Sequence, residues 1–118
     1  MGTKAEKKAV RRWRKGWKAV FLGPESKLYS FTFVLNRGVV EYEVGKVTVP
    51  KEGCGPLCVF KTERDAKALE LTRCYSIRPC LYLASKEQEV WDGTNDPRVP
   101  DWLLPKGTRL ADAVKLLG

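Results

Sequence analysis

From Trp17 onward, short runs of aromatic and β-branched residues alternate with segments of glycine, proline, asparagine and serine. The first kind of residue favours strands, and the second kind favours tight reversals of the chain. The alternation therefore predicts an antiparallel sheet of five or six strands. The expected strands cover residues 17–22, 28–35, 39–44, 57–61, 75–84 and 88–91. The clearest hairpin joins 28–35 to 39–44 through the turn 36–38.

Two segments carry helix signals instead. Thr3 and Glu6 match a capping box, and apolar residues at helical spacing follow, so residues 4–15 predict a short basic amphipathic helix. Thr62 with Asp65 three residues later predicts a second, central helix over 63–73. Pro79 indicates that strand 75–84 is an edge strand or carries a bulge. For residues 109–117, helix and strand both remain open.

These elements predict the α+β class: a single small domain with a mainly antiparallel sheet, one central helix and an N-terminal basic helix. The length of 118 residues fits one domain. We expect a basic amphipathic N-terminal arm at residues 1–18 and a compact α+β domain at 19–118. No apolar run is long enough to span a membrane, and no signal peptide is evident, which favours an intracellular (cytoplasmic) protein without a membrane partner.

The positive charge is distributed very unevenly. The net charge is +8, and residues 1–18 hold eight basic side chains against one acidic side chain, which leaves the rest of the chain almost neutral. A dense group of cations can neutralise phosphates and release counterions, and tryptophans can stack on unpaired bases. The arm is therefore our candidate nucleic-acid interface. Its expected contact residues are Lys4, Lys7, Lys8, Arg11, Arg12, Trp13, Arg14, Lys15 and Lys18. The alternatives are a solvated helix whose tryptophans dock on the domain, a frayed tail, and an amphipathic helix on a membrane surface, which is the least favoured.

The residue inventory excludes several kinds of chemistry. Histidine is absent, which removes Ser-His-Asp and Cys-His catalysis and imidazole-based zinc sites. We expect no catalytic residue, no cofactor and no metal. The four cysteines, Cys54, Cys58, Cys74 and Cys80, have poor zinc-site spacing, so free thiols are favoured, with a disulfide or a metal as alternatives. Trp91 and Trp102 flank a long loop, which we expect them to attach to the core.

A set of motifs in a fixed order resembles short uncharacterised proteins of phages, other mobile elements and environmental prokaryotic sequences. The resemblance covers residues 17–118 and implies neither a cofactor nor a catalytic residue. The motifs are Leu28-Tyr29-Ser30, Tyr42-Glu43-Val44-Gly45, Gly55-Pro56-Leu57-Cys58-Val59-Phe60-Lys61-Thr62, Leu104-Pro105-Lys106-Gly107-Thr108 and Val114-Lys115-Leu116-Leu117.

A second, weaker likeness is to ADP-ribosyltransferase-like folds. It implies that Ser30 or Tyr42 would help to hold a nicotinamide dinucleotide, with Glu87 or Glu89 as the acidic residue. The likeness departs from the family pattern because no histidine is present and because Glu87 and Glu89 match the late glutamate by position only.

The leading expectation is thus a non-enzymatic accessory binding protein of phage or mobile-element type that contacts nucleic acid or another polyanion. A protein–protein interaction module, such as a host-complex inhibitor or virion component, is the first alternative. A divergent ADP-ribosyltransferase-like enzyme is the second. No small-molecule substrate is identified.

Overall fold

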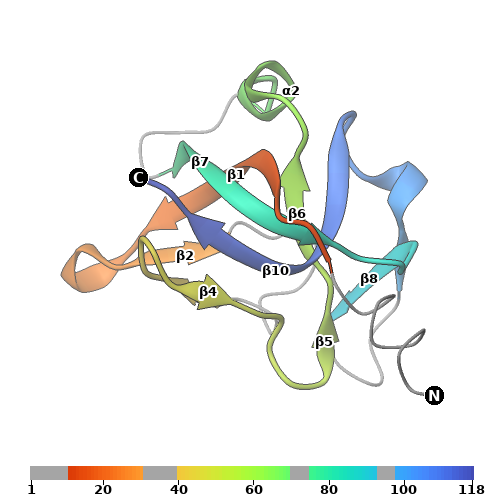
Figure 1. The fold of residues 1–118 in the computed structure, drawn as a ribbon, viewed down its shortest axis with the longest axis horizontal. Helices are drawn as coiled ribbons and strands as arrows, with labels where there is room; N and C mark the ends of the chain where they lie inside the picture. Colours follow the sequence, from red (N-terminus) through yellow and green to blue (C-terminus); the bar gives the residue numbers. More distant parts are fainter. Residues whose placement is uncertain (1–10, 31–39, 70–74, 93–97) are drawn as a thin grey trace.

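The computed structural model describes residues 11–30, 40–69, 75–92 and 98–118 (Figure 1). Most of the elements are strands, and α2 is the single α-helix in the described ranges. The elements in chain order are β1 (Arg14–Leu22), the 3₁₀ turn η1 (Pro24–Ser26), β2 (Leu28–Ser30), β3 (Glu41–Tyr42), β4 (Val47–Thr48), β5 (Cys54–Gly55), β6 (Leu57–Phe60), α2 (Glu63–Lys67), β7 (Tyr75–Ala84), β8 (Glu89–Asp92), β9 (Val99–Pro100), the 3₁₀ turn η3 (Asp101–Leu103) and β10 (Thr108–Leu116).

Four antiparallel strands close into a small barrel. β7 pairs with β1 on one side and with β10 on the other, and β6 joins β1 to β10 to complete the ring. β2 and β3 extend the sheet from β1, and β4 extends it from β10. β5, β8 and β9 form a second, three-stranded sheet. In Figure 1, β7 and β10 run side by side across the centre.

The barrel interior holds the main hydrophobic core. Its buried side chains come from every barrel strand and from β2 and β3, which extend the sheet from β1. They are Val20, Leu28, Tyr42, Leu57, Val59, Cys80, Tyr82, Ala111, Val114 and Leu116. A second cluster of Val90, Leu104 and Leu110 joins the small sheet to β10.

The predicted N-terminal helix is wrong where the structure describes that segment. Residues 11–13 have no regular structure, and Arg14 and Lys15 are the first residues of β1, while residues 4–10 lie outside the described ranges. Eight consecutive residues of β1, Arg14–Phe21, are in register with β7. The barrel thus provides partners for this backbone, whereas a short isolated helix is marginal in water. The expected boundary between residues 18 and 19 falls inside this strand.

The α+β prediction with a central helix over 63–73 is also wrong, because the fold is a mainly antiparallel β structure. The helix start is correct: Thr62 caps α2 by accepting a hydrogen bond from the Asp65 amide at 3.2 Å. However, α2 ends at Lys67, and Ala66 is its one buried residue. A helix that buries so little has no packing to extend it. Residues 70–74 lie outside the described ranges.

The remaining expectations concern strand pairing. Residues 109–117, left open above, form most of β10. β2 pairs with β3 in the expected antiparallel sense, although the turn at 36–38 lies outside the described residues. β7 is a central strand over Cys80–Ala84, which is in register with β10, but Tyr75–Pro79 is in register with β1 alone. Pro79 therefore stands where β7 has an open edge on the β10 side, as the sequence predicts for a proline in a strand.

Among the described residues, no helix has the length and apolar character needed to cross a membrane.

Candidate nucleic-acid interface

The residues of the predicted basic arm differ in their exposure to solvent. Arg12 is exposed just before β1, and Arg14 and Lys15 are exposed at its start. Trp13 between them is 39% exposed. Lys4, Lys7 and Lys8 lie outside the described residues. Successive side chains of a strand point to opposite faces, so Arg14 shares its face with Gly16 and Lys18, while Lys15 points the other way.

Arg11 is neutralised by the protein itself. Its guanidinium lies 2.8 Å from the Asp112 carboxylate and also donates to the backbone carbonyl of Ala84. Asp112 sits at the register shift between Ala111 and Ala113 in β10. Arg11 therefore fastens the start of the chain's described part to β7 and β10 and is not available to a ligand in this arrangement.

Lys18 does not belong to the predicted surface, because it lies inside the barrel. It is 2% exposed, and its Nζ donates to the Cys58 carbonyl oxygen at 2.7 Å. The same Nζ lies 5.7 Å from the centroid of the Tyr42 ring. Burial lowers the pKa of Lys18 below its usual 10.5. The nearby Cys58 and Cys80 raise this pKa, but by less than burial lowers it. Lys18 cannot reach a phosphate outside the barrel.

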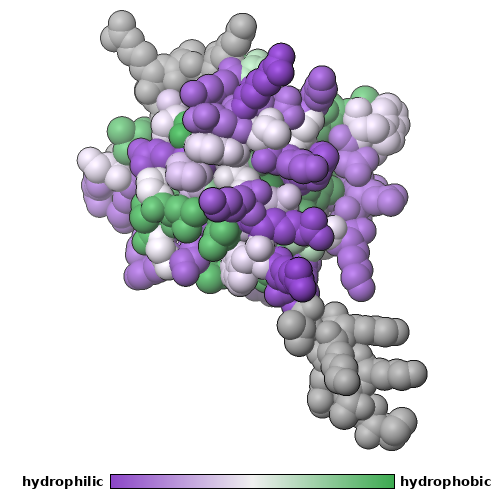
Figure 2. Space-filling view, turned by 45° about the horizontal axis from the view of Figure 1, so that its top comes forward, coloured by the Kyte–Doolittle hydropathy of each residue, from purple (hydrophilic) through white to green (hydrophobic). Residues whose placement is uncertain are grey.

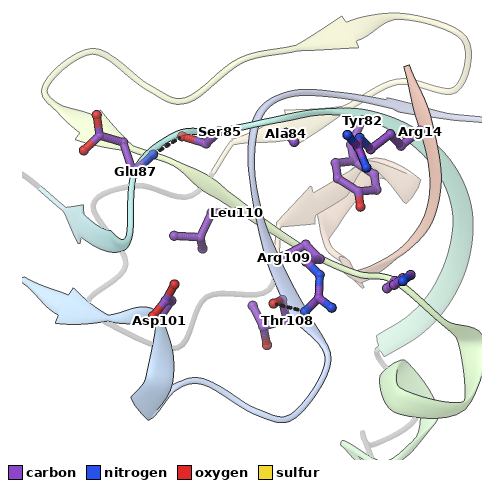
Figure 3. Close-up of a pocket in the computed structure, with 10 residues that line it drawn as sticks. Arg14, Tyr82, Ala84, Ser85, Glu87, Asp101, Thr108, Arg109 and Leu110 are labelled. Carbon is purple, nitrogen blue, oxygen red and sulfur yellow. Dashed lines mark hydrogen bonds between the residues drawn. The ribbon is translucent and has the colours of Figure 1, made fainter. Parts of the chain in front are cut away.

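A pocket of about 450 Å³ opens at the end of the barrel where β1 begins (Figure 3). It contains three cationic side chains, two carboxylates and several neutral groups. Its lining residues are Arg14, Lys61, Tyr82, Ala84, Ser85, Glu87, Asp101, Thr108, Arg109 and Leu110. We call it the barrel-mouth pocket.

Strand register brings the three cations together. Arg14 is in register with Tyr82 of β7, which places both on the same side of the barrel wall. Thr108 and Arg109 of β10 are in register with Phe60 and Val59 of β6, and the Lys61 amide then donates to the Gly107 carbonyl at 3.2 Å. Lys61 and Arg109 are therefore close neighbours on adjacent strands, although they are distant in sequence.

Two glycines fix the shape of this end of the barrel. Gly107 has φ +82° in a turn closed by the Thr108 amide and the Pro105 carbonyl, at 3.1 Å. A Cβ at Gly16 would stand 2.8 Å from the Tyr82 ring. The bare Gly16 backbone thus permits the Tyr82 ring to lie against β1 and form part of the pocket wall.

The two acidic residues of the pocket, Glu87 and Asp101, lie apart from the guanidinium groups. The Asp101 amide donates to the carbonyl of Gln88 at 2.8 Å. This bond holds η3 close to the segment that contains Glu87. Figure 3 draws Glu87 and Asp101, well separated from each other, on one side of the pocket, and Arg14 and Arg109 on the other; the Glu87 carboxylate is turned outward. The barrel-mouth pocket is therefore bipolar, with a net excess of one positive charge.

The cations at this end have no acidic partner. Within the described residues, Arg12, Arg14, Lys15, Lys61 and Arg109 form no ion pair, and neither do six cations elsewhere: Lys51, Arg64, Arg78, Lys86, Lys106 and Lys115. What distinguishes the first five is that three of them line one pocket and the other two lie next to Arg14 or two residues from it in the sequence. Figure 2 shows a face dominated by hydrophilic side chains, with apolar ones in smaller areas. We call Arg12, Arg14, Lys15, Lys61 and Arg109 the uncompensated basic group, because none of them has an ion-pair partner among the described residues. Glu87 and Asp101 line the same pocket as three of them without forming an ion pair with them.

Trp91 and Trp102 differ from each other. The Arg98 guanidinium lies 4.2 Å from the Trp91 ring centroid, and the Trp91 ring packs close to Gly55. Trp102 is 77% exposed in η3, directly after the pocket residue Asp101. The expectation that both would attach the loop to the core is wrong for Trp102, whose side chain is largely exposed to solvent next to Asp101 in the sequence.

The residues of the transferase likeness lie in different surroundings. Tyr42 is buried in the barrel, and its hydroxyl finds no hydrogen-bond partner among the residues that the structure describes. Glu87 lines the barrel-mouth pocket, whereas Glu89 pairs with Arg98 at 2.9 Å. Within the described ranges, no group of three or more Cys, Asp or Glu side chains could hold a metal ion. Cys80 carries a free, buried thiol, and burial raises its pKa to about 11.

Sequence reasoning missed Lys61, Arg109, Tyr82 and Asp101. Lys61 and Arg109 are single basic residues at strand ends, and their meeting depends on the register between β6 and β10. The available signal was the turn at 105–108, which predicts a reversal but does not reveal the partner strand.

Comparison with protein-family models, with curated proteins and with solved structures gives no match.

Proposed function

We propose that this protein is a non-enzymatic accessory protein that binds nucleic acid, or a polyanion of similar charge density, at the barrel mouth. The observation that carries the proposal is the uncompensated basic group. Arg14, Lys61 and Arg109 line one pocket, Arg12 and Lys15 stand beside Arg14 in the sequence, and none of the five forms an ion pair in the described part of the chain. In the sequence, Lys4, Lys7 and Lys8 precede them.

Three features support a polyanion as the ligand. Cations left without carboxylate partners can each neutralise one phosphate and release its counterion. Arg14, Lys61 and Arg109 line one pocket, so several contacts to one ligand can form together. Trp13 precedes Arg14 in the sequence, and Trp102 follows Asp101. Their side chains are 39% and 77% exposed, so bases can stack on them. The resemblance to short phage and mobile-element proteins is compatible with such an accessory role.

Fluorescence anisotropy with a labelled oligonucleotide tests the proposal. The double variant Arg14→Ser/Arg109→Ser should lower the affinity about tenfold or more in dilute salt, because two phosphate contacts are lost. The matched control is Lys46→Ser/Lys67→Ser, which removes the same charge from two lysines engaged in ion pairs away from the pocket. The wild-type affinity should also fall steeply with salt.

Equal losses in the two double variants would contradict the proposal, because they would show that only the total charge matters. Failure of the wild type to bind any DNA, RNA or heparin would contradict it as well.

A protein–protein module is a second candidate, favoured by an apolar edge. In the described part of the chain, β4 pairs with β10 alone, and Val44, Val47, Val49 and Leu117 around it are exposed. An edge strand with apolar neighbours can accept an extended peptide segment as an added strand. A partner protein that is retained by Arg14→Ser/Arg109→Ser and lost by Val47→Lys would favour this candidate.

A further inference from the structure

We propose that the barrel-mouth pocket receives one unpaired nucleotide whose base carries an exocyclic amine, so that the protein prefers single strands to duplex. This inference rests on the proposed function and specifies its ligand. It follows from the size of the pocket, from the separation of its charges and from the exposed Trp102 beside it.

The pocket has the dimensions of a small-ligand site. Its volume of about 450 Å³ lies within the range that encloses small organic ligands. A duplex presents a continuous convex backbone, and its bases are stacked and paired inside. An unpaired nucleotide can instead turn its base into a concave site, as in proteins that recognise single strands.

The charge separation fits the two ends of a nucleotide. Arg14 and Arg109 lie on one side of the pocket in Figure 3, where a phosphate would find positive charge. Asp101 lies on the other side, where its carboxylate would repel a phosphate but accept hydrogen bonds from base N–H groups. Glu87 lies at the rim of the same side with its carboxylate turned outward, and a side-chain rotation would bring this carboxylate to the base as well. A simple phosphate site gains nothing from these two carboxylates.

The carboxylates also predict which bases enter. Cytosine, adenine and guanine carry an exocyclic amine that can donate to a carboxylate. Thymine and uracil present their N–H group between two carbonyl oxygens, which the carboxylates repel. In a duplex, Watson–Crick pairing occupies the same amines. The pocket therefore favours unpaired amino bases.

Trp102 can hold the next base of the strand. Its ring is 77% exposed, and it follows Asp101 directly in η3. Stacking on an exposed indole is tolerant of sequence, so it supports single-strand binding without changing the choice of base in the pocket.

Anisotropy with labelled oligo(dC), oligo(dT) and a hairpin duplex of about the same phosphate number tests the inference, with strands of roughly twelve nucleotides. The wild type should bind oligo(dC) about tenfold more tightly than oligo(dT) or the duplex. The variant Glu87→Gln/Asp101→Asn should weaken oligo(dC) binding and strengthen oligo(dT) binding, which would remove the preference. Cytidine 5′-monophosphate should compete only at far higher concentration than the strand.

Three results would overturn the inference while leaving polyanion binding intact. The first is equal affinity for the duplex and the single strand. The second is a Glu87→Gln/Asp101→Asn variant that binds oligo(dC) and oligo(dT) more tightly by the same factor. The third is half-displacement of the strand by micromolar cytidine 5′-monophosphate, which would assign the pocket to a free nucleotide. Absence of binding to every polyanion would instead overturn the proposed function, and this inference with it.

Discussion

Arg14 and Lys18 occupy the same face of the same strand, four residues apart, yet they lie in opposite environments. Arg14 lines the solvent-open pocket at the barrel mouth, while Lys18 is buried in the barrel and bonded to a backbone carbonyl. Both count equally in the charge of the sequence. The difference teaches that position along a barrel strand, and not the local density of basic residues, decides which cations can meet a ligand.

Gly16 separates the two regions, and its substitution should have the largest effect. In Gly16→Ala, the new Cβ would stand 2.8 Å from the Tyr82 ring and 3.0 Å from the Phe60 carbonyl oxygen. Overpacking of this kind costs about 1–3 kcal/mol, so the free energy of unfolding should fall by about that amount in urea denaturation. Gly118→Ala is the control, because nothing lies within 4 Å of its Cβ. An unchanged midpoint for Gly16→Ala would disprove the close contact.

Cys80 tests how dry the barrel interior is. Burial raises its pKa from 9.0 to about 11. The unfolded chain loses this proton at lower pH than the folded chain, so the stabilisation is present below pH 9 and is lost as the pH rises toward 11. Between these pH values, unfolding free energy should fall by about 2 kcal/mol more in the wild type than in Cys80→Ala. Parallel pH profiles would show that solvent reaches the thiol.

Lys18→Met should have a smaller effect of the opposite sign. Replacing a buried amine by an apolar side chain of similar length should raise the free energy of unfolding at pH 7 by about 1 kcal/mol. Because burial lowers the Lys18 pKa, the unfolded chain holds this proton to higher pH than the folded chain. The free energy of unfolding of the wild type should therefore rise with pH between the folded-state pKa of Lys18 and 10.5. The variant should lack this rise. A less stable Lys18→Met at pH 7 would indicate that the amine stabilises the barrel.

The sequence allowed the local elements to be predicted better than their assembly. The strand at 75–84 and the cap at Thr62 were found because their side-chain patterns are local. The start of β1 was missed because Arg14, Gly16 and Lys18 stand on its inward face, where a strand pattern would require apolar residues. Missing the start of β1 also made the predicted fold class wrong, because the barrel closes through the pairings that β1 makes with β6 and β7.

The candidate site was predictable only in part. Arg12, Arg14 and Lys15 were predicted as part of one basic interface and lie exposed at the start of β1, whereas Lys18 is buried and Arg11 forms an ion pair with Asp112. Lys61 and Arg109 could not have been added, because single basic residues acquire meaning only when strand register brings them to one pocket.

The dependence of nucleic-acid affinity on salt, compared between Arg14→Met and Lys18→Met, tests the central claim most directly. Each phosphate contact contributes about 0.7–0.9 to the slope of log K against log salt concentration. Arg14→Met should reduce the magnitude of the slope by about this amount, and Lys18→Met should leave the slope at its wild-type value. Equal reductions in the two variants would contradict the account, because the buried lysine would then count as much as the exposed arginine.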